Sequence, residues 1–349
     1  MKYIWNYYYS ITKKMLLFAG QWPYQKKREK LLRTILLITT ELSVMITQIK
    51  YLTDQLYFDW KTLENPEEYE IMKTYAAKAR LISLTYALYY LICCPLFIFT
   101  SLIPKILDIV VPLNESRPII MPHECHYFVS DDTEYFYYIF LHAFISMIIL
   151  VIPLLAHDCM ILTYIEHVCG IFAVAGFRFK NLAHNTGIEN NNIENVYDKK
   201  IVSSVHTHWR ALEFAEFLEN TFSVTLIIQM LIVIIAMSLT LFQMAIQLED
   251  PIETMRNTAF VVGQLIHIFC FSLQGQKLID HSLQMQDKIY NCSWYKIPVK
   301  SQRLLLNVMR RSLQPNILSA GGIYIFSLKS FMSVLQSAVS YFTVLASFQ

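Results

Sequence analysis

The stretch YFYYIFLHAFISMIILVIPLLAHDCMILTYIEHVCGIFAVAGF, residues 135–177, decides the fold of this chain. It is apolar almost throughout and is about twice as long as the roughly 20 residues with which an α-helix crosses a bilayer. As one helix it would be about 65 Å long, at about 1.5 Å per residue. Two crossings would need a turn near Pro153, yet the stretch has no glycine or asparagine there. We therefore expect one long helix that crosses the membrane and continues into the cytoplasm.

The composition agrees with a membrane protein made of several helices. Hydrophobic residues make up 55% of the 349 residues and charged residues only 16%, whereas soluble domains carry about 25% charged residues. Further apolar runs are expected to cross at residues 31–49, 80–104, 220–248 and 258–274, and a last apolar stretch covers residues 320–348. The sequence thus predicts an all-α, polytopic membrane bundle.

The distribution of Lys and Arg predicts the orientation of these helices. From residue 50 onward, the segments between the apolar runs contain five, two, five, one and seven of these residues in turn. Cytoplasmic flanks accumulate Lys and Arg, so the loops are expected to lie inside, outside, inside, outside and inside, with the C-terminus outside. The run at residues 31–49 has basic flanks on both sides. It is either re-entrant, or a crossing is missing near residues 46–51.

The same pattern divides the chain into segments. Lys329 would be costly in the middle of a span, so a break into two helices is expected near residues 327–330. The segments are a cytoplasmic start (1–30), a membrane region (31–177) with an extracellular loop at 105–134, a cytoplasmic segment (178–220), a second membrane region (221–274), a second cytoplasmic segment (275–326) and a terminal helix (327–349).

The sequence carries no motif for catalysis or for a cofactor. Glycine-rich phosphate loops, HExxH and GxSxG are all missing, and nothing points to nucleic-acid binding. Seven cysteines at irregular spacing give no disulfide framework. The run His123-Glu124-Cys125-His126 could in principle hold zinc, but it lacks a second ligand pair, so a solvated turn is the favoured interpretation and no metal site is predicted.

Three smaller features have more than one interpretation. His157 and Asp158 form an ionisable pair within the long apolar run, which is a functional candidate but equally a helix-packing pair. Asn114 begins a glycosylation sequon in the predicted extracellular loop, whereas the sequon at Asn291 falls on the cytoplasmic side and should be silent. On the last helix, small polar residues recur near one face, where they could pack helices, which is the commoner use, or line a pore: Ser333, Ser337, Ser340 and Ser347.

Four stretches, in the right order, closely resemble insect odorant receptors, and the resemblance covers nearly the whole chain. They are LDIVVPLNESRP (107–118), VHTHWRALEFAEFLENTFS (205–223), IYNCSWYKIPVKSQRLLLNVMRRSLQP (289–315) and QPNILSAGGIYIFSLKSFMSVLQSAVSYFTVLASF (314–348). The resemblance implies a seven-helix subunit of an odorant-gated, non-selective cation channel, not a G-protein-coupled receptor. It also implies a plasma-membrane location on the dendrite of an olfactory sensory neuron.

The resemblance further implies an assembly and a set of site residues. An odorant-tuned subunit joins a shared co-receptor in a hetero-tetramer, packed through the cytoplasmic anchor segments 178–220 and 275–326. The likeness of SYFTVL to the family's pore motif puts Val344, Ser347 and Phe348 at the gate, beside Ser340, although Phe348 is larger than the aliphatic residue expected there. A small apolar volatile would bind in the outer half of the bundle, at Tyr90, Cys93, Cys94, Phe97, Phe140, Phe144, Ile148, Phe260 and Gln264.

The chain departs from the family in one respect. Only one apolar run precedes the link into the third helix, where the family has two, so most of the second helix is expected to be missing or incomplete. A truncated, non-functional receptor is therefore one alternative. A membrane transporter is another, but it would predict internal repeats, and none is visible. A G-protein-coupled receptor would have the reverse orientation, with Asn114 in the cytoplasm.

Overall fold

This computed structural model describes residues 47–112, 117, 119–122, 134–182, 193–246, 251–292 and 294–347. The chain divides into two compact units, residues 1–61 and 62–349. In the first unit, a helix covers residues 47–61. The predicted cytoplasmic start and most of the first apolar run lie before residue 47, outside the described part. The crossing predicted to be missing near residues 46–51 falls at the start of this helix and stays a prediction.

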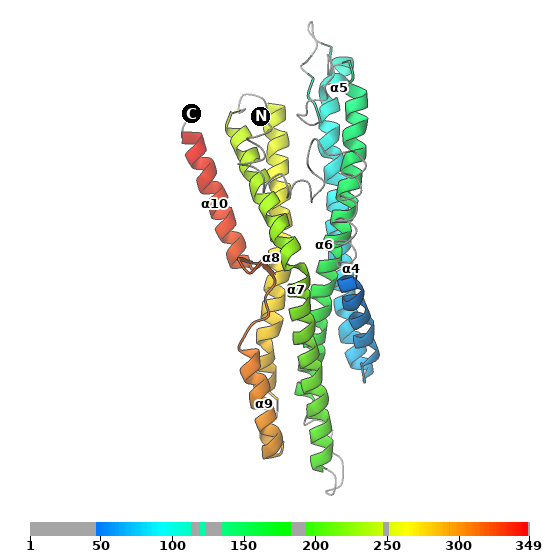
Figure 1. The fold of residues 1–349 in the computed structure, drawn as a ribbon, viewed down its shortest axis with the longest axis vertical. Helices are drawn as coiled ribbons and strands as arrows, with labels where there is room; N and C mark the ends of the chain where they lie inside the picture. Colours follow the sequence, from blue (N-terminus) through cyan, green and yellow to red (C-terminus); the bar gives the residue numbers. More distant parts are fainter. Residues whose placement is uncertain are drawn as a thin grey trace, which may run out of the picture. The chain divides into compact units, whose positions relative to one another are not determined.

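Four long helices build the larger unit: α4 (Pro66–Phe99), α6 (Phe136–Lys180), α7 (Ile193–Ile246) and α8 (Pro251–Tyr290). A short 3₁₀ turn, η1 (Thr100–Leu102), and α5 (Ile103–Val110) extend α4. Figure 1 shows the four long helices running nearly along one direction. We call the end where α4 and α7 begin the polar end, and the end where they finish the apolar end.

All four long helices contain a stretch that is long and apolar enough to cross a membrane. The prediction of a single helix from the stretch 135–177 is confirmed, because α6 runs for 45 residues and passes Pro153 without a break. The helices α7 and α8 likewise continue through the expected segment boundaries at residues 220 and 274. Helical structure also extends through α5 into the segment expected to be a loop from residue 105.

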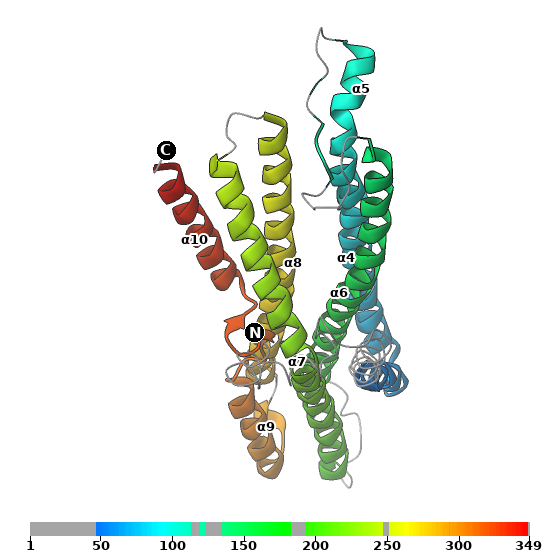
Figure 2. The ribbon, with the colours of Figure 1, turned by 45° about the horizontal axis from the view of Figure 1, so that its top comes forward.

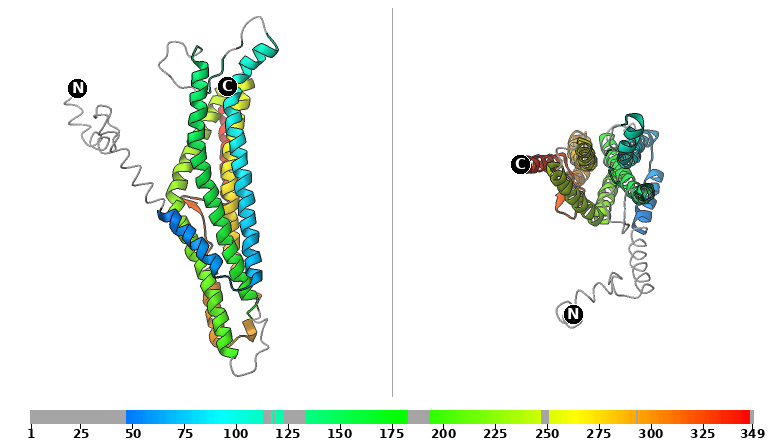
Figure 3. Two further views of the ribbon diagram at one scale, coloured as in Figure 1. Left: turned by 90° about the vertical axis from the view of Figure 1, so that its right-hand side faces the viewer. Right: turned by 90° about the horizontal axis from the view of Figure 1, so that it is seen from above.

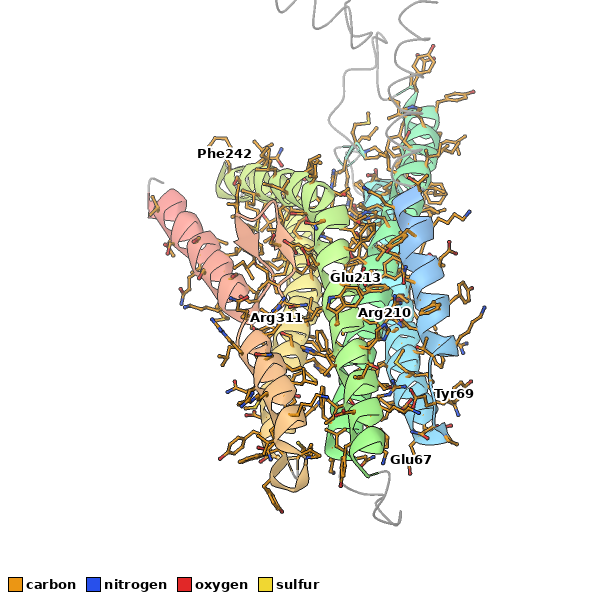
Figure 4. The ribbon with its side chains drawn as sticks, turned by 60° about the horizontal axis from the view of Figure 1, so that its bottom comes forward. Glu67, Tyr69, Arg210, Glu213, Phe242 and Arg311 are labelled. Carbon is orange, nitrogen blue, oxygen red and sulfur yellow. The ribbon has the colours of Figure 1, made fainter. Side chains whose placement is uncertain are left out.

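Burial differs between the two ends of the bundle. Near the polar end, α6 and α7 bury large side chains completely, among them Ile165, Phe172 and Leu218. Toward the apolar end the helices expose large aliphatic side chains, with Leu150 71% exposed. Charged residues such as Arg210 and Glu213 lie toward the polar end, which faces the viewer in Figure 4, and Phe242 lies at the apolar end of α7. The exposed aliphatic surface suits contact with lipid.

The last part of the larger unit forms short elements and then one final helix. After η2 (Trp294–Lys296) and α9 (Val299–Ser312) comes a hairpin of two short strands, β1 (Ser319–Ala320) and β2 (Tyr324–Ile325), followed by α10 (Leu328–Ser347). The strands are antiparallel, with Ser319 opposite Ile325 and Ala320 opposite Tyr324. The expected break near residues 327–330 is thus confirmed, and Lys329 lies in the first turn of α10.

The piece before that break is a hairpin, which corrects the prediction of a helix there. Its physical cause is the pair Gly321 and Gly322, whose φ angles are 60° and 69°. Residues with a side chain rarely adopt this conformation, and two such residues in succession turn the chain back on itself. A helix cannot pass through them.

The hairpin is fastened to α7 and α8. On α7, the Glu219 carboxylate accepts hydrogen bonds from the Ser319 backbone N–H at 2.8 Å and from the Ser319 hydroxyl, and the Gly321 N–H donates to the Ser223 carbonyl at 3.1 Å. On α8, Gly275 lies so close that an added Cβ would be 2.2 Å from the Phe326 carbonyl oxygen. From this attachment α10 rises along α7 and α8, on the side away from α4 and α6 (Figures 2 and 3).

Candidate functional site

A buried polar cluster joins all four long helices, and we call it the Asp158 cluster. The Asp158 carboxylate on α6 accepts a hydrogen bond from the Tyr86 hydroxyl on α4 at 2.8 Å and one from the Gln229 amide on α7 at 3.2 Å. His267 on α8 places Nδ1 2.7 Å from the Tyr86 oxygen. The Tyr86 hydroxyl has one hydrogen and donates it to Asp158, so His267 Nδ1 carries a hydrogen and donates to the Tyr86 oxygen. His157 lies beside the cluster, with Nδ1 3.6 Å from Asp158.

The cluster explains how an acidic residue is accommodated within the apolar part of α6. A buried carboxylate is costly unless donors surround it, and here the donors come from two other helices. Each hydrogen bond fixes the rotation and height of one helix against α6. The sequence identified the pair His157 and Asp158 as a candidate, and the structure shows Asp158 as the acceptor at a junction of four helices.

Three predicted ligand residues lie together on the apolar-end side of this cluster, between α4 and α8. The Tyr90 ring packs 4.9 Å from the Tyr86 ring, and its hydroxyl donates to the Gly263 carbonyl at 3.4 Å. Nearer the apolar end, the Phe97 and Phe260 rings pack with centroids 6.0 Å apart. We call Tyr90, Phe97 and Phe260 the α4–α8 aromatic group. Such an aromatic surface suits a small apolar molecule.

Two other predicted residues belong to a separate contact. Phe140 and Phe144 on α6 pack against Phe99 on α4, at ring distances of 5.7 and 5.8 Å. Phe99 is on a different face of α4 from Phe97, so the two aromatic contacts lie on opposite flanks of the α4 end. Of the remaining predicted ligand residues, Cys94 and Gln264 are half-buried, whereas Cys93 and Ile148 are exposed.

The predicted pore helix α10 carries its small polar residues at the surface, and some of them line a gap toward α7. Ser333, Ser337 and Ser340 are exposed, and so is Val344. The Ser337 hydroxyl donates to the Ser333 carbonyl at 2.8 Å, so this side chain is satisfied within its own helix. A cavity of about 440 Å³ separates the base of α10 from α7 and is lined by Met237, Ser238, Leu241, Ser333, Val334 and Ser337, among others.

Some predicted site residues cannot be placed. α10 ends at Ser347, whose side chain lies outside the described part, as does the whole of Phe348. The glycosylation residue Asn114 and the run 123–126 also lie outside it. The gate and glycosylation residues therefore stay predictions.

Two ion pairs hold the polar end together. The Arg178 guanidinium on α6 binds the buried Glu68 carboxylate on α4 through two hydrogen bonds of 2.8 and 2.7 Å. The third Arg178 nitrogen, Nη1, donates to Ser203 and Thr207 on α7. Lys277 on α8 binds the buried Glu166 of α6, with a distance of 2.6 Å to one carboxylate oxygen. Paired charges of this kind link the helices where the exposed surface is polar.

The described cysteines are free thiols. Cys292 lies just after α8, and burial raises the pKa of its thiol. A thiol that stays protonated is a poor nucleophile and a poor metal ligand. It is therefore a packing residue.

Sequence reasoning missed several residues of these contacts. Tyr86, Gln229 and His267 are single polar residues within apolar runs, and their meeting depends on how each helix is rotated. One usable signal was the spacing of Tyr86 and Tyr90, which puts both on one face of α4. Arg256 was counted only as a loop charge, yet its guanidinium stacks 4.9 Å above the Phe97 ring.

Comparison with curated proteins identifies relatives of one kind. A family model described as 7tm odorant receptor matches residues 36–339. Odorant receptor 9a of Drosophila melanogaster is 25% identical over 191 residues, covering 55% of this chain and 46% of that receptor. Odorant receptor Or2 of Anopheles gambiae is 26% identical over 155 residues, covering 43% of this chain and 36% of that receptor. The chain thus spans about half, or less, of the length of these curated relatives.

Comparison with solved structures finds the same fold. The olfactory receptor OR5 of Machilis hrabei in complex with eugenol superposes with a TM-score of 0.63, covering 98% of both chains at 12% identity. A second structure of that receptor gives a TM-score of 0.57 and covers both chains fully. Because the family model covers most of the chain and the relatives are receptors of this kind, this multi-pass membrane protein belongs to the insect 7tm odorant receptor family.

Proposed function

We propose that this chain is the odorant-tuned subunit of a ligand-gated, non-selective cation channel in the plasma membrane of olfactory neurons. The observation that carries the proposal is α10. It is a helix long enough to cross a bilayer, it stands apart from α4 and α6, and it exposes Ser333, Ser337 and Ser340. A helix with exposed hydroxyls along it suits the wall of an aqueous pore, with Val344 as part of an apolar ring that closes it.

The α4–α8 aromatic group is the proposed odorant site. Tyr90, Phe97 and Phe260 contribute aromatic surface, Gln264 lies one turn from Phe260, and Phe140 and Phe144 flank the group across α4. The structurally similar receptor of Machilis hrabei is described in complex with eugenol, a small volatile. A ligand of that size would bind here through apolar contact and a few polar groups.

The polar end is the proposed anchor through which subunits assemble with a co-receptor. Around α9, several large apolar side chains are exposed outside the long helices: Trp294, Tyr295, Val299, Leu304, Leu306 and Leu313. Single exposed apolar side chains are common on protein surfaces. A group of this size on α9 and the preceding turn η2 marks an interaction surface. A neighbouring subunit would cover it in a hetero-tetramer.

The test combines recording with chemical access to α10. The chain is expressed with an insect odorant co-receptor in oocytes, and currents are recorded during pulses of neutral volatiles that include eugenol. Single cysteines are then placed at Ser337 and Ser340 and exposed to a water-borne, charged thiol reagent during odour pulses. Modification should change the evoked current, whereas a cysteine at Val339, which lies about 100° away from Ser340 around the helix, should have less effect.

Two results would contradict the proposal. One is a surface-expressed complex that passes no odour-evoked current with any volatile. The other is an evoked current that is indifferent to modification at both Ser337 and Ser340, since these side chains would then not face the pore.

A further inference from the structure

Two buried polar groups beside the α4–α8 aromatic group have no hydrogen-bond partner in the described structure: the Ser101 hydroxyl and the Asn257 amide nitrogen. Ser101 is 1% exposed and Asn257 is 8% exposed. A buried polar group without a partner is destabilising, and native proteins rarely retain one without a reason. Each of these two groups therefore needs an explanation.

Both residues belong to the helix faces that form the aromatic contact. Ser101 follows Phe97 by four residues, and Asn257 precedes Phe260 by three residues, so each shares a face with its phenylalanine. The chain runs in opposite directions in α4 and α8, so both positions are displaced from the Phe97–Phe260 contact toward the apolar end. The two unpaired groups thus lie at one side of the proposed ligand site.

The usual local partner of Ser101 is already occupied. A serine in helical structure commonly donates to the carbonyl four residues earlier, which here is that of Phe97. The Thr100 hydroxyl donates to that same carbonyl at 2.6 Å. The Ser101 hydroxyl is therefore left available for an external partner.

The positive charge of Arg256, which lies next to this site, is neutralised. Arg256, which stacks on Phe97, donates from Nη1 to the Met121 carbonyl at 3.2 Å and from Nη2 to the Pro122 carbonyl at 3.1 Å. Its Nη1 also lies 3.4 Å from the Glu253 carboxylate. With these partners Arg256 does not require an anionic ligand, so the site is suited to a neutral molecule.

We propose that Asn257 and Ser101 form a polar subsite that binds the oxygen of a neutral, oxygenated volatile, such as a ketone or an ester, whose apolar chain lies against Phe97 and Phe260. This inference rests on the proposed odorant site and names the ligand class of that site. The Asn257 amide N–H donates to the ligand oxygen, and the Ser101 hydroxyl donates a second hydrogen bond. A hydrocarbon of the same length leaves both groups unpaired, so the site discriminates against it.

The test measures binding to the purified full-length chain in lipid nanodiscs. Three series of six to ten carbons are compared: 2-alkanones, n-alkanes and alkanoic acids at pH 7.4. Dissociation constants are taken from the ligand-induced rise in unfolding temperature. The best 2-alkanone is expected to bind at least about tenfold more tightly than the alkane of equal length, because it accepts two neutral hydrogen bonds that the alkane cannot accept. The acids are expected to bind more weakly than the ketones.

Two variants of α8 separate a ligand effect from a folding effect. Asn257→Leu should raise the unfolding temperature without ligand, because it removes an unpaired buried amide nitrogen, and should lower the ketone-to-alkane ratio by several-fold, leaving only the contribution of Ser101. Gln274→Met is the matched control, because Gln274 also has a buried unpaired amide oxygen but lies more than four turns away. It should keep the wild-type ratio. Ser101→Ala should reduce the ratio in part.

The outcomes distinguish this inference from the proposed function. Equal binding of ketones and alkanes to the wild-type chain, or an unchanged ratio in Asn257→Leu, would overturn the polar subsite while leaving an odorant site in place. Binding of the acids in preference to the ketones would also overturn it. If no series binds, the odorant site itself is wrong, and the subsite with it.

Discussion

The Tyr86 hydroxyl lies 2.8 Å from the Asp158 carboxylate, and this hydrogen bond joins α4 to the middle of α6. The same hydroxyl lies 2.7 Å from His267 Nδ1, which brings α8 into the junction. The residues come from segments 72 positions or more apart in the sequence, so the bond depends on the packed bundle. It therefore offers a direct probe of that packing.

Tyr86→Phe should lower the free energy of unfolding by about 1–3 kcal/mol, because the buried carboxylate of Asp158 loses a donor. Thermal unfolding in nanodiscs measures the effect. Tyr90→Phe is the matched control on the next turn of α4, since its hydroxyl donates a long, 3.4 Å hydrogen bond to the Gly263 carbonyl. Equal small losses of stability in both variants would show that the Tyr86–Asp158 hydrogen bond does not stabilise the packing of α4 against α6.

Arg178→Met should destabilise the protein by about 3–5 kcal/mol, because it leaves the carboxylate of Glu68 buried and uncompensated. The control is Lys73→Met, which breaks the exposed pair of Lys73 with Glu70 on α4. An exposed pair contributes about 0–1 kcal/mol. Unfolding temperatures that drop equally in the two variants would contradict the importance assigned to the buried pair.

Gly275→Ala should disturb the hairpin that carries α10, because the new Cβ would lie 2.2 Å from the Phe326 carbonyl oxygen. Overpacking of this kind costs about 1–3 kcal/mol. Gly263→Ala, on the same helix, meets its nearest atom at 3.6 Å and should be neutral or stabilising by up to about 1 kcal/mol. Unfolding temperature and odour-evoked current are measured together, and only Gly275→Ala should lower both.

Val344→Ala should raise the resting leak of the complex with a co-receptor, because a smaller side chain weakens an apolar gate. Val339→Ala is the control: the two valines are similarly exposed, at 54% and 56%, but point in different directions around α10. Whole-cell conductance without odour is the measurement. An unchanged conductance in Val344→Ala, at wild-type surface expression, would count against Val344 as a gate residue.

Asn114→Gln should abolish a glycosidase-sensitive shift on a gel, whereas Asn291→Gln should leave the shift intact. The reason is the predicted orientation, which puts the first sequon outside and the second in the cytoplasm. The opposite result, with the shift depending on Asn291, would reverse the orientation of every helix.

The length of α6 could be predicted because residues 135–177 contain no cluster of turn-forming residues, and one proline is tolerated within a bundle. The continuity of α7 and α8 was harder to see. Along its length, α7 changes from amphipathic to apolar and α8 from apolar to amphipathic, and each change looks like a boundary in the sequence. The side-chain composition of a helix changes where its surroundings change from water to lipid. The backbone hydrogen bonds of the helix continue across that point.

The hairpin before α10 and the Asp158 cluster were not predicted in detail. Two-residue strands leave no period in a sequence, and only the Gly321–Gly322 pair indicates the turn. The polar cluster depends on four helix rotations at once. Of the predicted ligand residues, those with aromatic rings found partners across α4, α6 and α8, because large rings near an interface reach a neighbouring helix from several positions.

Asp158 stands at the midpoint of α6, 22 residues from Phe136 and 22 residues from Lys180. The helix continues through this point without a break, and hydrogen bonds to α4 and α7 hold its centre in place. Toward Lys180, ion pairs to Glu68 and Lys277 and fully buried side chains hold α6 in place, whereas the half toward Phe136 exposes many of its side chains. The two halves, each about 33 Å long, are thus restrained unequally, and a force applied at Phe140 or Phe144 acts on the less restrained half.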